Sequence, residues 1–160
     1  IHAGLARARL PGRFEIVDYH PLTILDGAHN HDKMIRLLET LKARYPQKKI
    51  ACLIAATTNH GKDTMFDELF KQSDRIAITR FTTSARTAMD PKILVDRANQ
   101  KNLEADIRAF LYPRDGLQWL RKHAQKNELI LITGSLFLVS DVRNYWMPAS
   151  RILEKRTPFI

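Results

Sequence analysis

Residues 49–56 read KIACLIAA, and this run decides the fold class. A nearly unbroken apolar run of this length is typical of a strand that is buried on both faces of a parallel sheet. A second run of the same kind, ELILIT, occupies residues 128–133. Two such strands predict an α/β domain built around a parallel sheet.

Outward from these runs, short β-rich segments alternate with amphipathic helical patterns. Residues 22–26 read as a strand, and the apolar residues between 34 and 41 then recur at helical spacing. Further strands are predicted at 75–79 and 107–111, with an edge strand near 15–18, and further helices around 65–70, 91–99, 117–124 and after 135. This order predicts a Rossmann-like open, mostly parallel six-stranded sheet flanked by helices.

The cysteine content and the hydropathy of the sequence indicate the cellular compartment. The single cysteine, Cys52, lies inside an apolar run, which excludes an intrachain disulfide and indicates a buried thiol in a reducing compartment. No apolar stretch approaches the ~18 residues that span a bilayer, and no secretory signal is recognisable. We therefore expect a cytoplasmic protein without a membrane partner. The first residue is Ile1, not methionine, which suggests a fragment of a longer protein.

The formal net charge of +9 leaves two explanations open. One is a solvated basic surface, and the other is an anionic partner such as ATP or a polycarboxylate. Nucleic acid is disfavoured, because the basic residues are scattered and no helix-turn-helix or RNA-binding sheet is recognisable. A non-enzymatic nucleotide- or nucleic-acid-binding α/β module remains the alternative function.

Two polar motifs follow predicted strands, at the sheet edge where open α/β sheets bind ligands. In LDGAHN, residues 25–30, the candidates are Asp26, His29 and Asn30, which precede a helix whose unpaired N–H groups favour an anion. Alternatively, Asp26 and Asn30 only satisfy backbone donors of the turn. The second motif is Gly134-Ser135, after the strand at 128–133, where Ser135 either caps the next helix or binds a carboxylate. Lys62 is a candidate cation beside the same edge.

Two kinds of site are missing from the sequence. There is no glycine-rich phosphate loop, and His29 and His31 do not have convincing metal-ligand spacing, so we expect no metal site in this domain. Without a phosphate loop and a magnesium carboxylate, the chain does not activate ATP by itself in the usual way.

Three ordered motifs carry a family resemblance. LPGRFE at 10–15, LDGAHN at 25–30 and ITGSLF at 132–137 resemble motifs of folylpolyglutamate synthase and dihydrofolate synthase, members of the Mur ligase superfamily. The resemblance extends from Leu10 to about Tyr145. It implies a C-terminal domain of an ATP-dependent ligase in which ATP phosphorylates a folate carboxylate and the amine of L-glutamate then attacks the acyl phosphate. It does not separate monofunctional from bifunctional enzymes.

The resemblance also implies a domain layout and partners. Residues 1–14 would be an interdomain linker, 15–147 a Mur ligase C-terminal-like domain, and 148–160 a basic tail. The N-terminal ATPase domain of the same polypeptide would hold most of the contacts to ATP and Mg²⁺, and the fragment alone would be inactive. The small-molecule partners would be folate, L-glutamate and ATP.

Residue roles are carried over by position in the three motifs and near them. The resemblance implies catalytic roles for His29 and Asp26. It implies glutamate binding by His29, Lys62, Ser135 and Arg86, and ATP binding by Arg13, Asp26 and Asn30.

Overall fold

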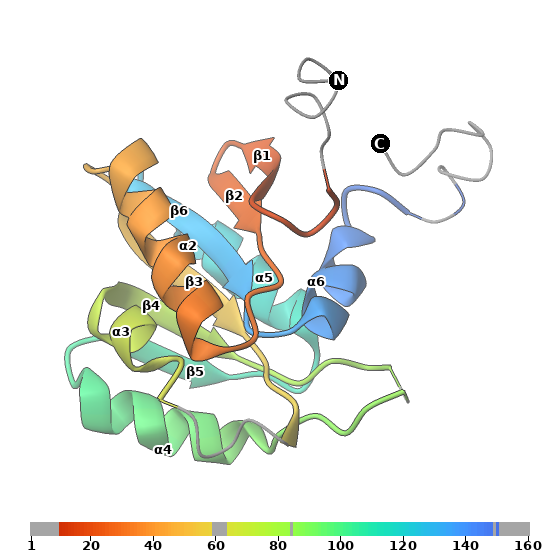
Figure 1. Cartoon of the computed structure of the whole chain (residues 1–160). Coiled ribbons are helices and arrows are strands. Elements are labelled where there is room, and N and C mark those ends of the chain that lie inside the picture. The colour runs from red at the N-terminus through yellow and green to blue at the C-terminus, as the bar shows by residue number, and fades with distance from the viewer. Residues whose placement is uncertain (1–9, 59–63, 84, 149, 151–160) are drawn as a thin grey trace.

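The two apolar runs form neighbouring strands at the centre of a six-stranded sheet (Figure 1). The computed structural model describes residues 10–58, 64–83, 85–148 and 150. The strands are β1 (Glu15–Tyr19), β2 (Leu22–Leu25), β3 (Lys49–Ile54), β4 (Ser73–Ile78), β5 (Asp106–Ala109) and β6 (Glu128–Thr133). The helices are α2 (His31–Arg44), α3 (Asp67–Lys71), α4 (Pro91–Lys101), α5 (Pro113–His123) and α6 (Leu136–Arg143).

The strand order is β1-β2-β6-β3-β4-β5. Neighbouring strands are parallel except for the antiparallel pair of β1 and β2. The prediction of an open, mostly parallel six-stranded sheet is therefore confirmed, as is the edge strand that begins at Glu15.

Helices cover both faces of the sheet, as Figure 1 shows. Alternate residues of a strand point to opposite faces. In β3, Cys52 and Ile54 belong to the core shared with α2, α3 and α4, whereas Ala51 and Leu53 belong to the core shared with α5 and α6. This is why β3 is apolar at nearly every position.

The position of β6 brings two distant loops together. The chain leaves β2, forms α2 and enters β3 two places along the sheet, and β6 fills the place between β2 and β3. The Asp26 N–H donates to the Ile132 carbonyl at 3.0 Å, and the Gly134 N–H donates to the Ala28 carbonyl at 3.0 Å. The loop after β2 and the turn after β6 are therefore adjacent at the carboxyl edge of the sheet.

Some predicted boundaries differ from the structure. The strand predicted at 107–111 is Asp106–Ala109, and the helix predicted around 65–70 is the short α3. β5 is an edge strand with mostly exposed residues, so hydrophobic alternation defines its ends poorly. Most of the expected linker and tail lies outside the described residues, and both remain predictions.

Candidate functional site

A cleft of about 730 Å³ lies at the carboxyl edge of the sheet. It is lined by His29, Thr57, Thr58, Ala85, Arg86, Thr87, Gly134, Ser135, Leu136 and Phe137. Three of the predicted glutamate-binding residues, His29, Arg86 and Ser135, reach it from three different loops. This convergence follows from the strand order, because the loops after β2, β4 and β6 open at the same edge.

The His29 ring is held on two sides. Its Nδ1 lies 2.7 Å from the Gly27 carbonyl oxygen, and its Nε2 lies 3.2 Å from the Lys33 ammonium. A carbonyl oxygen only accepts and an ammonium only donates, so Nδ1 carries the ring proton and Nε2 accepts. These contacts fit a ring that carries a proton on Nδ1, and they place the Lys33 ammonium beside His29.

Lys33 was not among the predicted site residues. It lies four residues after His29, a spacing that brings side chains together along a helix. That spacing is the only signal in the sequence, and it is weak because His29 itself precedes the first turn of α2.

Ser135 is both a helix cap and a wall of the cleft. Its hydroxyl oxygen accepts from the Phe137 N–H at 3.2 Å, which caps α6, and the residue is buried. The hydroxyl proton remains chemically available as a donor. The capping alternative thus describes the contacts of Ser135 without removing it from the cleft.

Gly134 allows this tight turn. Its φ of +98° lies in the region that side chains disfavour, and a Cβ there would lie 2.6 Å from the Ala55 carbonyl oxygen and 2.7 Å from the Phe66 ring. A larger residue would clash with the backbone that follows β3 and with the Phe66 ring.

Asp26 and Asn30 do not line the cleft, and their contacts match the backbone-satisfying alternative. Asp26 accepts from the Phe14 N–H and the Ala28 N–H, both at 2.8 Å. Asn30 caps α2, with its side-chain oxygen accepting from the Lys33 N–H at 3.0 Å. Their predicted roles in ATP binding and catalysis remain predictions.

Arg13 and Lys62 are the remaining candidate residues. Arg13 is exposed in the loop before β1, and the carbonyl of its neighbour Gly12 accepts from the Gly27 N–H in the loop after β2. Lys62 lies outside the described residues, so its predicted contact with glutamate remains a prediction.

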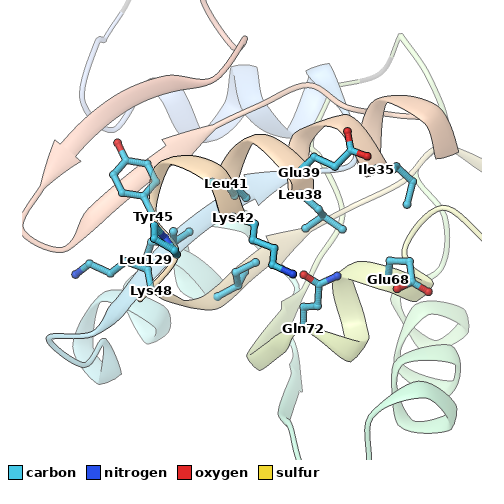
Figure 2. Close-up of a pocket in the computed structure, with 12 residues that line it drawn as sticks. Ile35, Leu38, Glu39, Leu41, Lys42, Tyr45, Lys48, Glu68, Gln72 and Leu129 are labelled. Atoms are coloured by element: carbon cyan, nitrogen blue, oxygen red, sulfur yellow. The ribbon is translucent and has the colours of Figure 1, made fainter.

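A second cavity, of about 440 Å³, lies at the opposite edge (Figure 2). Leu38 and Leu41 of α2, with Ile50 and Leu129 near the amino ends of β3 and β6, contribute its apolar part. Lys42, Lys48, Glu39 and Glu68 lie around it. None of the predicted site residues lines this cavity, so we place the candidate site in the larger cleft at the carboxyl edge.

Clustered metal ligands and membrane-spanning helices are both absent from the described ranges. Among those residues, no group of three or more His, Cys, Asp or Glu side chains is placed to hold a metal ion. No helix in the same ranges has the length and hydropathy that crossing a bilayer requires.

The sheet order and the cleft define an open α/β domain with a cleft at a basic and hydroxyl-bearing edge. Residues 12–136 match the family described as Mur ligase, glutamate ligase domain. The chain belongs to this family.

Sequence relatives agree with this assignment. The chain is 33% identical over 143 residues to the dihydrofolate synthase/folylpolyglutamate synthase of Bacillus subtilis, covering 89% of this chain and 32% of that protein. It is 28% identical over 153 residues to a probable bifunctional folylpolyglutamate synthase/dihydropteroate synthase of Haloferax volcanii, covering 93% of this chain and 17% of that protein. The chain thus spans a third or less of the length of these relatives.

Solved structures share the fold. A folylpolyglutamate synthase of Mycobacterium tuberculosis complexed with ADP matches with a TM-score of 0.78 and 20% identity, over 91% of this chain and 34% of that one. A bifunctional folylpolyglutamate synthase/dihydrofolate synthase of Yersinia pestis with Mn, AMPPNP and L-glutamate bound matches with a TM-score of 0.69 and 20% identity, over 87% and 32%. At these identities the matches establish the fold alone.

Proposed function

We propose that this chain is the C-terminal domain of an ATP-dependent ligase that adds L-glutamate to folate through an acyl phosphate. The carrying observation is that His29, Arg86 and Ser135 line one cleft in a chain of the glutamate ligase family. The names of the Bacillus subtilis and Yersinia pestis proteins support folate and L-glutamate as the substrates.

The cleft suits a dicarboxylate amino acid. Arg86 is exposed and offers a planar guanidinium, and Ser135 offers a hydroxyl proton. Lys33 adds an ammonium beside His29. In this proposal Arg86, Ser135 and the Lys33–His29 pair receive the carboxylates of glutamate, and Lys62 acts beside them.

ATP is assigned to the side of Arg13. Arg13 is exposed, and we propose that it reaches an ATP phosphate held by the N-terminal ATPase domain of the same polypeptide. Asp26 and Asn30 belong to this side, and their contacts favour a role in fixing the backbone near Arg13 and the start of α2. Mg²⁺ would come with the ATPase domain and stabilise the charge of the transferred phosphoryl group.

The ligation consists of a phosphoryl transfer and an acyl transfer, and it needs no oxidant or reductant. A folate carboxylate oxygen attacks the γ-phosphorus of ATP and ADP leaves. The glutamate amine then attacks the acyl carbon, phosphate leaves, and the amine loses a proton. A cytoplasmic location is part of this proposal, and the buried free thiol of Cys52 supports it.

The test is ADP release by the full-length ligase that contains this domain, with ATP, Mg²⁺, L-glutamate and either dihydropteroate or a reduced folate. We expect ADP only when a folate-type substrate and glutamate are both present. Arg86→Ala should raise the KM for glutamate about tenfold or more, the scale of losing one charged hydrogen bond. Arg80→Ala, an exposed arginine outside the cleft, is the matched control. No substrate-dependent ADP from the folded protein would overturn the proposal.

A further inference from the structure

α6 lies between the two loops that carry the candidate arginines. Its residue Val139 packs against Gly12, so closely that a Cβ on Gly12 would lie 2.9 Å from the Val139 Cγ1. At its other side the Phe137 ring lies 5.2 Å from the Phe81 ring, at the start of the segment that leads to Arg86. Figure 1 shows α6 below the segment that enters β1. One short helix therefore contacts both loops.

Arg143, at the end of α6, fastens the loop of Arg13. Its Nε lies 3.1 and 3.0 Å from the two Glu15 carboxylate oxygens, and one terminal nitrogen lies 2.9 Å from Oε1. Both side chains are mostly buried, at 15% and 17% exposure, so solvent screens this pair less than a surface pair. Glu15 Oε2 also accepts from the Gly12 N–H at 2.8 Å. Arg143 thus orients the carboxylate that holds the backbone beside Arg13.

Further backbone hydrogen bonds hold the residues on both sides of Arg13. Gly12 has φ +70° and its carbonyl accepts from the Gly27 N–H at 2.8 Å. Phe14 has φ +44° and its N–H donates to Asp26. The residues on both sides of Arg13 are therefore fixed, while Arg13 itself is exposed.

Asp141, two residues before Arg143, fastens the other loop. Its Oδ2 accepts from the Thr82 N–H at 2.6 Å and from the Thr82 hydroxyl at 2.9 Å. The far end of the segment is held by the Met89 N–H, which donates to the Ala56 carbonyl at 2.8 Å, and by a bridge between Thr57 and Ala88. Arg86 lies between these two attachments.

We infer that α6 is a positioning element for both arginines: Arg143 sets Arg13 through Glu15, and Asp141 sets Arg86 through Thr82. Neither residue lines the cleft, so each acts through the loop that it holds. Positioning of a substrate-binding group is worth large factors in rate, because small displacements of the reacting groups remove the productive geometry. The assignment of Arg13 and Arg86 to different substrates rests on the proposed function.

The first test measures amide exchange in this chain and needs no activity. Arg143→Ala should accelerate exchange of the Gly12 N–H about tenfold or more and leave Thr82 unchanged. Asp141→Ala should do the reverse. Ser140→Ala, in the same helix and exposed, is the control and should change neither. Equal acceleration at both amides in both variants, or none in either, would overturn the inference.

The second test measures kinetics in the full-length ligase. Asp141→Ala should raise the KM for glutamate about tenfold and change the KM for ATP less than about twofold. Arg143→Ala should raise the KM for ATP and change the KM for glutamate less than about twofold. Arg143→Lys and Asp141→Asn, which keep part of each contact, should be intermediate and serve where the alanine variants unfold. The role in catalysis would be overturned if amide exchange followed the expected pattern while Asp141→Ala left the KM for glutamate unchanged and Arg143→Ala left the KM for ATP unchanged. The expected exchange pattern in a protein without ligation would instead count against the proposed function alone.

Discussion

At the residue scale, the contacts of Asp26 fit one of the two interpretations that the sequence left open, the one in which it satisfies backbone donors. Both of its carboxylate oxygens accept backbone N–H groups, from Phe14 and Ala28. Phe14 lies in the left-handed region, which costs a non-glycine residue about 1–2 kcal/mol. The bond from the Phe14 N–H to Asp26 helps to offset that cost, so Asp26 supports the Arg13 loop through its backbone.

This geometry predicts a stability loss on truncation of Asp26. Asp26→Ala should lower the free energy of unfolding by about 3 kcal/mol, because two partly buried N–H groups lose a charged acceptor. Urea unfolding of the chain measures the change. Asp32→Ala removes an exposed carboxylate from the first turn of α2 and should cost less than about 1 kcal/mol. Equal losses in the two variants would show that Asp26 does not hold the loop.

At the scale of elements, the strands and helices were predictable where one pattern was long and unmixed. β3 and β6 followed from unbroken apolar runs, and α2 from the helical spacing of its buried residues Met34, Leu37, Leu38 and Leu41. The place of β6 between β2 and β3 was not predictable, because it depends on packing between segments far apart in the chain.

Some residues of the candidate site could also be predicted from the sequence, and others could not. His29 and Ser135 were identifiable because each follows a strand that ends at the ligand-binding edge. The contact of Lys33 with His29 was not, since it depends on how the loop enters α2. Arg143 and Asp141 gave no signal at all, because their partners Glu15 and Thr82 are far away in sequence.

The burial of β3 predicts an unreactive thiol. Burial raises the pKa of Cys52 from 9.0 to about 12, against a smaller lowering by its hydrogen bond with Ser73. At pH 8 iodoacetamide should label Cys52 only in the unfolded chain, because the thiolate is the nucleophile. A chain carrying Cys52→Ala and Ser140→Cys presents an exposed thiol and should be labelled in the folded state.

The same shift has a consequence for stability. The unfolded chain loses this proton near pH 9, and the folded chain retains it up to about pH 12. The contribution of Cys52 is therefore fully present below pH 9 and is lost as the pH rises from 9 to 12. Rapid labelling of the folded chain at pH 8 would contradict both the burial and this dependence.

At the scale of the whole molecule, the net charge of +9 is the excess of 26 Lys and Arg residues over 17 Asp and Glu residues. Several described basic residues are paired with carboxylates, which neutralises those pairs and leaves the excess charge on other residues. The paired basic residues include Arg36, Lys49, Lys71, Arg75, Arg97, Lys101, Arg108, Arg121 and Arg143. Arg75 is bound by buried Glu128 in the interior of the sheet, where no phosphate backbone can reach it without breaking the pair.

The scattered positions of the basic residues along the chain predict weak binding of polyanions, which separates the ligase domain from the rival binding module. Duplex DNA should bind the chain with a Kd weaker than about 10⁻⁵ M at physiological salt, within the range of non-specific binding. Each phosphate that a protein neutralises adds about 0.9 to the slope of log K against log salt concentration, so the slope should stay near that of two or three contacts. Arg86→Ala should leave the slope unchanged, because Arg86 belongs to the cleft and not to a basic stripe. A tight complex whose slope reports six or more contacts would require an ordered basic surface, and it would favour the nucleic-acid-binding module over the ligase.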